Sequence, residues 1–166
     1  MIWGHIMKFR YKFALLLCCI SNAAFSEQSS TQQIDSDTWE IISQAVKDAD
    51  IISMASTYHP DAVVVSEGNT TPISVALKKW GEGMEQARLD GATANVSFRF
   101  KSRNDNNSTA HETGIFKYIA TDSAGMETVL YMNFETLLVK KENRWLFLME
   151  RQLEQTDEAS WEALKN

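Results

Sequence analysis

The chain has 166 residues, the size of a single domain, and carries 22 acidic against 16 basic residues. Its formal charge of −6 argues against nucleic acid as a partner, because phosphate backbones repel an acidic surface. The cysteines and histidines form no zinc pattern, and no phosphate-binding glycine loop is present, so we expect neither a metal nor another cofactor.

Residues 1–26 predict a signal peptide. Three basic residues precede the apolar run 13–20, and the small residues Ala24 and Ser26 then stand at the −3 and −1 positions of a cleavage site. The apolar run is too short to span a bilayer as a helix. We therefore expect an exported protein, periplasmic or secreted, with no membrane attachment after cleavage. A retained anchor and a lipoprotein signal at Cys18 or Cys19 are the alternatives.

Cleavage after Ser26 removes both cysteines, so the mature domain has no possible disulfide and depends on a hydrophobic core. Loss of the three basic residues of the signal changes the formal charge from −6 to −9. Residues 27–36, rich in Ser and Gln, then predict a flexible leader.

Helical periodicity begins after a capping-box pattern at Asp37 and predicts a helix over residues 38–57, which Pro60 ends. A β-branched run predicts a short strand at 61–65, followed by a loop at 66–71. A second helix follows, with Thr71 as its cap and Pro72 at its first position.

Apolar alternation of period two begins at Ala94 and predicts four long strands. After the first, they cover residues 109–120, 126–141 and 144–154. The C-terminal tail, 157–166, adds a short helix. Helices segregated from a strand meander indicate an α+β fold, in which a long sheet curls and two helices cover its concave face. A pocket is expected between the two layers.

Three stretches resemble the SnoaL-like and ketosteroid-isomerase-like branch of the nuclear transport factor 2-like superfamily. They are Tyr58-His59-Pro60-Asp61-Ala62-Val63-Val64, the following Pro72-capped helix, and Val139-Lys140-Lys141-Glu142-Asn143-Arg144-Trp145. The likeness covers nearly all of the mature chain and predicts a SnoaL-like domain over 37–156. It implies a cystatin-like α+β fold: a cone-shaped, curved antiparallel sheet with N-terminal helices on its concave face. It implies no single activity, because the superfamily hosts enzymes, binders and assembly domains.

The resemblance also places the three catalytic positions of the isomerases. The base falls at Ser66, the oxyanion-hole tyrosine at Ile42, and the buried carboxylic acid at Glu135. Two of the three groups are missing, so we expect no ketosteroid isomerisation.

Three residues are candidate catalytic groups: Glu135, Glu150 and His111. If the side of the strand that carries Glu135 is concave, desolvation would raise the pKa of that carboxyl group, and Glu150 could share the pocket. His111 could act as a base near neutral pH. The alternative is that the carboxylates pair with nearby arginines and that the histidine is a hydrogen-bonded or solvated strand residue.

Candidate ligand-binding residues have aromatic or polar side chains that the predicted fold directs to the pocket: Trp39, Tyr58, Ser66, Trp80, Asn133 and Glu135. Core packing is the alternative for the aromatic residues, and solvation at a loop rim is the alternative for Ser66.

Apolar residues on both sides of the last two strands predict an interface. Trp145, Phe147 and Met149 are expected on the convex face, where the resemblance also implies a homodimer. The leading hypothesis is an exported domain that binds a small, partly apolar ligand. The alternatives are an isomerase, cyclase or dehydratase that uses pocket carboxylates, and a pure assembly module.

Overall fold

A computed structural model describes residues 29–164, so the predicted signal peptide lies outside the described residues. The helical segments are α1 (Ser30–Ile34), the π-helical turn η1 (Asp35–Trp39), α2 (Glu40–Asp48), α3 (Ile51–Ala55), α4 (Ile73–Leu89) and α5 (Glu158–Ala163). The strands are β1 (Tyr58–Ser66), β2 (Asn69–Pro72), β3 (Thr93–Asp105), β4 (Thr109–Thr121), β5 (Glu127–Lys141) and β6 (Arg144–Thr156).

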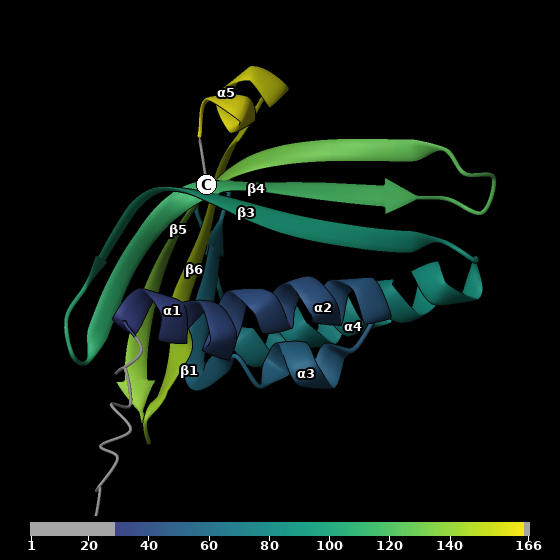
Figure 1. The fold of residues 1–166 in the computed structure, drawn as a ribbon. Coiled ribbons are helices and arrows are strands. Elements are labelled where there is room, and N and C mark those ends of the chain that lie inside the picture. The colour runs from purple at the N-terminus through teal and green to yellow at the C-terminus, as the bar shows by residue number, and fades with distance from the viewer. Residues whose placement is uncertain (1–28, 165–166) are drawn as a thin grey trace, which may run out of the picture.

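The strands form one curved sheet in the order β2-β1-β6-β5-β4-β3. Segments α1 to α4 cover its concave, inner face, and α5 lies on the opposite, outer face (Figure 1). The expected α+β fold class is therefore confirmed. The core lies between the helices and the inner face, where Phe134, Leu138, Trp145 and Phe147 are buried.

The sheet is mixed, whereas we expected it to be antiparallel throughout. Strand β1 pairs with β6 in parallel, and every other neighbouring pair is antiparallel. Only strands joined by a tight hairpin must run in opposite directions. Because α4 and four strands separate β1 from β6 in the chain, nothing local sets their relative direction.

The helical region begins at Ser30, within the expected leader. Ser29 Oγ accepts a hydrogen bond from Gln32 N, and the Gln32 side chain accepts one from Ser29 N, so the capping box lies here and not at Asp37. Burial of Ile34 anchors this segment to the core. The Asp37 carboxylate instead accepts a hydrogen bond from Trp145 N on β6.

The helix expected over residues 38–57 is interrupted at Ala49, which has a φ of 52° and ends α2. Asp50 then caps α3 by accepting hydrogen bonds from the backbone of Ile52 and Ser53. This left-handed residue changes the chain direction, so that α3 packs against α2 and α4.

Strand β1 is longer than expected and includes Pro60. Its register against β6 shifts between Tyr58 and Val63, and such an irregularity accommodates a residue that has no N–H to donate. The expected loop at 66–71 is a hairpin: Glu67 and Gly68 both have positive φ, and β2 follows directly. Pro72 precedes α4, which begins without a side-chain cap.

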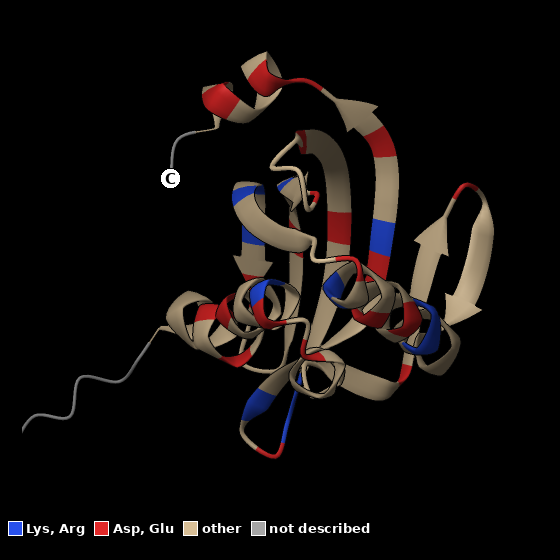
Figure 2. Cartoon of the chain, turned by 90° about the vertical axis from the view of Figure 1, so that its right-hand side faces the viewer, with Lys and Arg blue, Asp and Glu red and all other residues tan. Residues whose placement is uncertain are grey.

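The four long strands and the terminal helix are confirmed, with ends within a few residues of those expected. The turn between β5 and β6 uses Glu142 and Asn143, both at positive φ, as the favoured two-residue hairpin turn requires. Helix α5 packs on the outer face through Trp161, whose ring lies 4.4 Å from the Arg99 guanidinium. Figure 2 shows acidic segments on α5, which has no basic residue.

Candidate functional site

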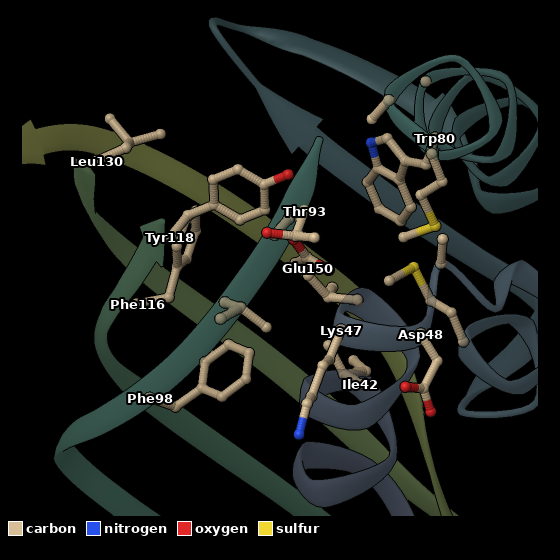
Figure 3. Close-up of a pocket in the computed structure, with 18 of the residues that line it drawn as sticks. Ile42, Lys47, Asp48, Trp80, Thr93, Phe98, Phe116, Tyr118, Leu130 and Glu150 are labelled. Atoms are coloured by element: carbon tan, nitrogen blue, oxygen red, sulfur yellow. The ribbon is translucent and has the colours of Figure 1, made fainter. Parts of the chain in front are cut away.

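A cavity of about 640 Å³ lies between the helices and the inner face of the sheet. Residues of α2, α3 and α4 line one side, and residues of β3 to β6 line the other. Figure 3 shows Phe98, Phe116 and Tyr118 on one side, Trp80 on the other, and Glu150 near the middle. Because most lining side chains are apolar and few are polar, the cavity has the composition of a small-molecule site.

Aromatic rings in contact form a continuous wall along this cavity. The Trp39 ring centroid lies 4.5 Å from that of Phe98 and 4.8 Å from that of Phe147. Tyr58 extends the wall, with its ring centroid 5.3 Å from Phe147 and 6.2 Å from Trp80. The tilted and edge-on arrangements are those that aromatic pairs prefer.

A buried ionic network fixes the position of Trp39. Its indole Nε1 donates a hydrogen bond to Glu112 at 2.7 Å, and Arg103 Nε donates to the same carboxylate at 2.7 Å. Arg103 also pairs with Asp35 at 2.6 Å, which ties η1 to β3 and β4. Burial raises the pKa of Glu112, and the hydrogen bond from Arg103 opposes that shift.

The polar part of the cavity is a short hydrogen-bonded chain that ends at Glu150. The Tyr58 hydroxyl donates to Glu150 Oε2 at 2.6 Å, and Gln152 Nε2 donates to Glu150 Oε1 at 2.9 Å. Burial, together with the adjacent charge of Glu150, raises the pKa of Tyr58 well above its ordinary value. Tyr58 is therefore a neutral donor at physiological pH, and Glu150 is an acceptor within the cavity.

Charged side chains at the rim come from the two helices. Lys47 and Asp48 end α2, and Lys79 and Arg88 belong to α4; all four are exposed. Arg88 is bound through two nitrogens to Glu85, at 2.8 and 2.9 Å, so its charge is already compensated.

Four of the predicted site residues line this cavity: Trp39, Tyr58, Trp80 and Glu150. Ser66 pairs with Gln152 at the end of β1 and does not line the cavity itself. Ile42 does line it, with an apolar side chain where the resemblance placed an isomerase tyrosine.

A pocket role for Glu135 and Asn133 required the concave side of β5, and neither residue lies there. The inner face of β5 carries Phe134 and Thr136, both buried, so Glu135 and Asn133 are on the outer face. His111 is also on the outer face, and no cluster of Glu135, Glu150 and His111 forms. Alternation alone could not decide the face, because both sides of β5 carry apolar residues.

The outer-face residues have partners of their own. His111 Nε2 lies 2.8 Å from Glu135 Oε1, and Arg151 donates to the other oxygen of Glu135 at 3.3 Å. These contacts lower the pKa of Glu135, His111 being the largest cause. The predicted pairing of Glu135 with an arginine is confirmed. Asn133 accepts a hydrogen bond from Lys101 at 2.6 Å.

The predicted convex stripe is wrong for Trp145 and Phe147, and only Met149 lies on the outer face. The pairing of β6 with β5 skips Leu148, so one residue is inserted at this point of β6. Trp145 and Phe147 precede the insertion and are buried in the core, whereas Met149 follows it and lies on the outer face. The same insertion turns Glu150 into the cavity.

Sequence reasoning missed Gln152, Glu112 and Arg103. Glu112 lies between Ala110 and Gly114 on the inner side of β4, and these small residues give no apolar alternation that would mark a buried face. The partner of Glu112, Arg103, follows an irregularity in β3 that shifts its alternation as well.

Among residues 29–164, no three acidic, histidine or cysteine side chains gather as metal ligands. Within the same range, no helix combines the length and apolarity needed to cross a membrane.

No family model and no curated protein matches the chain. Several solved structures, however, are similar to it. An NTF-2-like protein of unknown function from Shewanella oneidensis MR-1 is 15% identical, with a TM-score of 0.62, over 76% of this chain and 100% of that chain. A putative calcium/calmodulin-dependent protein kinase II association domain from Xanthomonas campestris is 13% identical, with a TM-score of 0.58, over 92% of this chain and 99% of that chain.

A ketosteroid isomerase-like protein from Erwinia carotovora atroseptica SCRI1043 is 16% identical, with a TM-score of 0.51, over 74% of this chain and 95% of that chain. At such identities these similarities establish the fold and leave activity open.

Proposed function

Because the chain has the nuclear transport factor 2-like fold, we propose that it binds a small, largely apolar molecule in the cavity between helices and sheet. The observation that carries this proposal is the cavity of about 640 Å³, with its aromatic wall and the hydrogen-bonded group of Tyr58, Glu150 and Gln152. Such a site buries an apolar body and orients it by one polar contact.

Binding is tested with the uncharged dye N-phenyl-1-naphthylamine, which fluoresces when it leaves water for an apolar site. We expect saturable fluorescence that Ala94→Trp reduces, because Ala94 lines the cavity and an indole would fill part of it. Ala124→Trp, in the exposed turn before β5, is the matched control and should leave binding unchanged. Absence of saturable binding by the wild type would overturn the proposal.

Catalysis by Glu150 is the second candidate, favoured by the placement of this carboxylate in the cavity beside a protonated tyrosine. Glu150 would accept a proton from the bound molecule, and Tyr58 would position it. We still expect no 5-ene to 4-ene ketosteroid conversion, because Ile42 offers no proton and Glu135 lies outside the cavity. Turnover that Glu150→Gln abolishes would contradict this expectation and establish the enzyme.

We also propose that the protein is exported, on the order of basic, apolar and small residues within 1–26. N-terminal sequencing of the periplasmic or secreted protein should then begin near Glu27. An intact Met1 or Met7 on cytosolic protein would rule export out.

A further inference from the structure

Glu150 is a carboxylate in an aromatic cavity, and its partners are neutral. The one hydrogen of the Tyr58 hydroxyl and one of the Gln152 amide hydrogens are directed at it. Each carboxylate oxygen keeps capacity for a further hydrogen bond, because an ionised carboxylate has about four acceptor sites. A ligand that reaches Glu150 must therefore offer a hydrogen-bond donor.

Within the described residues, the charge of Glu150 forms no ion pair, in contrast to those of two other carboxylates. In the described part of the chain, the half-buried Glu135 pairs with Arg151, and the buried Glu112 pairs with Arg103. No lysine, arginine or histidine forms such a pair with Glu150 within residues 29–164. Glu150 is partly buried, and withdrawing a charge from water is costly unless an opposite charge meets it, so this position favours a cation that comes from outside the chain.

The walls near Glu150 suit a cation as well. Tyr58, which is hydrogen-bonded to Glu150, and Trp80 both line the cavity, with 6.2 Å between their ring centroids. The faces of aromatic rings attract ammonium groups, and more strongly where water is excluded. A carboxylate ligand would meet repulsion from Glu150 in the same space.

We infer that the ligand is an amphipathic amine, whose protonated nitrogen pairs with Glu150 while its apolar body contacts the aromatic wall. This inference rests on the proposed binding function and names the chemical class of the ligand. The rim lysines, Lys47 and Lys79, would favour an anion instead, but both are exposed and solvated, so their effect is screened.

The test uses three compounds with one apolar body: 4-phenylbutylamine, 4-phenylbutan-1-ol and 4-phenylbutyrate. Each displaces N-phenyl-1-naphthylamine from the purified protein, and the competition curves rank their affinities. We expect the amine to bind about tenfold more tightly than the alcohol, because a hydrogen bond between two charged groups is stronger than one with a single charge. The butyrate should bind most weakly.

Two variants test whether the preference for the amine over the alcohol depends on Glu150. Glu150→Gln keeps the shape of the side chain without its charge, and it should bring the amine and the alcohol to equal affinity. Glu135→Gln makes the same change on the outer face, away from the cavity, and should retain the preference for the amine. Dye binding to each variant shows that the cavity is intact.

The outcomes separate the inference from the function on which it rests. If the dye binds and the alcohol or the butyrate equals the amine, the amine inference is overturned and the binding function stands. If the preference survives in Glu150→Gln, the inference is overturned in the same way. If the dye does not bind the wild type, both fail. The wild-type ranking decides the matter even if Glu150→Gln does not fold.

Discussion

Glu112 shows how one buried carboxylate depends on its neighbours. Its side chain is 1% exposed, and its two oxygens accept hydrogen bonds from Arg103 and Trp39. Removing one partner of a buried pair leaves a charge without compensation, which costs far more than the pair contributes in net stability.

Arg103→Met should therefore lower the free energy of unfolding by about 3–5 kcal/mol. Urea titration followed by circular dichroism measures this loss. The control is Arg88→Met, which breaks an exposed pair with Glu85 and should cost far less, because solvent screens that pair. Equal losses in the two variants would contradict a special role for burial.

Glu135 contributes stability that depends on pH. Its pKa in the folded protein is lowered from about 4.5, mainly by the hydrogen bond with His111 and then by Arg151. A carboxyl whose folded pKa is depressed stabilises the protein above its unfolded pKa, and that stability is lost as the pH falls through the folded pKa.

Glu135→Gln should thus cost up to about 1 kcal/mol near neutral pH, since the site is partly exposed. The difference in the free energy of unfolding between this variant and the wild type should shrink as the pH falls below about 4.5. Urea unfolding of both proteins over that range measures the difference. A difference that stays constant at all pH values would show that the charge of Glu135 contributes nothing to stability.

At the scale of elements, the alternation of inward and outward side chains along β6 reverses at Leu148. Trp145 and Phe147 face the core before the register shift, and Met149 faces outward after it. An inserted residue in one strand of a pair reverses the faces of the residues that follow it, here up to the second register shift, between Gln152 and Gln155.

Phe147→Asp tests this placement. Phe147 is 1% exposed within the core, so an aspartate there should prevent folding rather than dissociate an assembly. Circular dichroism and one-dimensional NMR of the purified variant should show no native structure. A folded monomeric variant would mean that Phe147 lies at a surface, as the alternation of the sequence first suggested.

At the scale of the molecule, the outer face has two parts. Helix α5 covers one part through Trp161, near Arg99 and Tyr131. The other part is an outer apolar strip on β5 and β6. It consists of Leu137, Val139, Leu146 and Met149.

We propose that a second copy of the chain covers the outer apolar strip. Leu137 is 41% exposed, although it is a large apolar side chain. Sedimentation at micromolar concentration should give a dimer, and Leu137→Asp should give a folded monomer, because the change leaves the core intact. A wild-type monomer under these conditions would refute the proposal.

The sequence alone predicted the order of the elements, the α+β class and the wall residues Trp39, Tyr58 and Trp80. Helical and strand periodicities are local, and the inner stripe of an amphipathic helix, which carries Trp39 and Trp80, faces the layer that packs against it. The expected fold resemblance is confirmed, because it depended on that order.

The tertiary structure decided which face of each strand meets the helices. Both faces of β5 and β6 carry apolar residues, so period-two alternation is equally consistent with either choice. The residue inserted at Leu148 depends on pairing with β5, and the parallel contact of β1 with β6 joins segments far apart in the chain. Long-range strand pairing therefore places Glu150 in the cavity and Glu135 on the outer face. No local sequence pattern predicts this pairing.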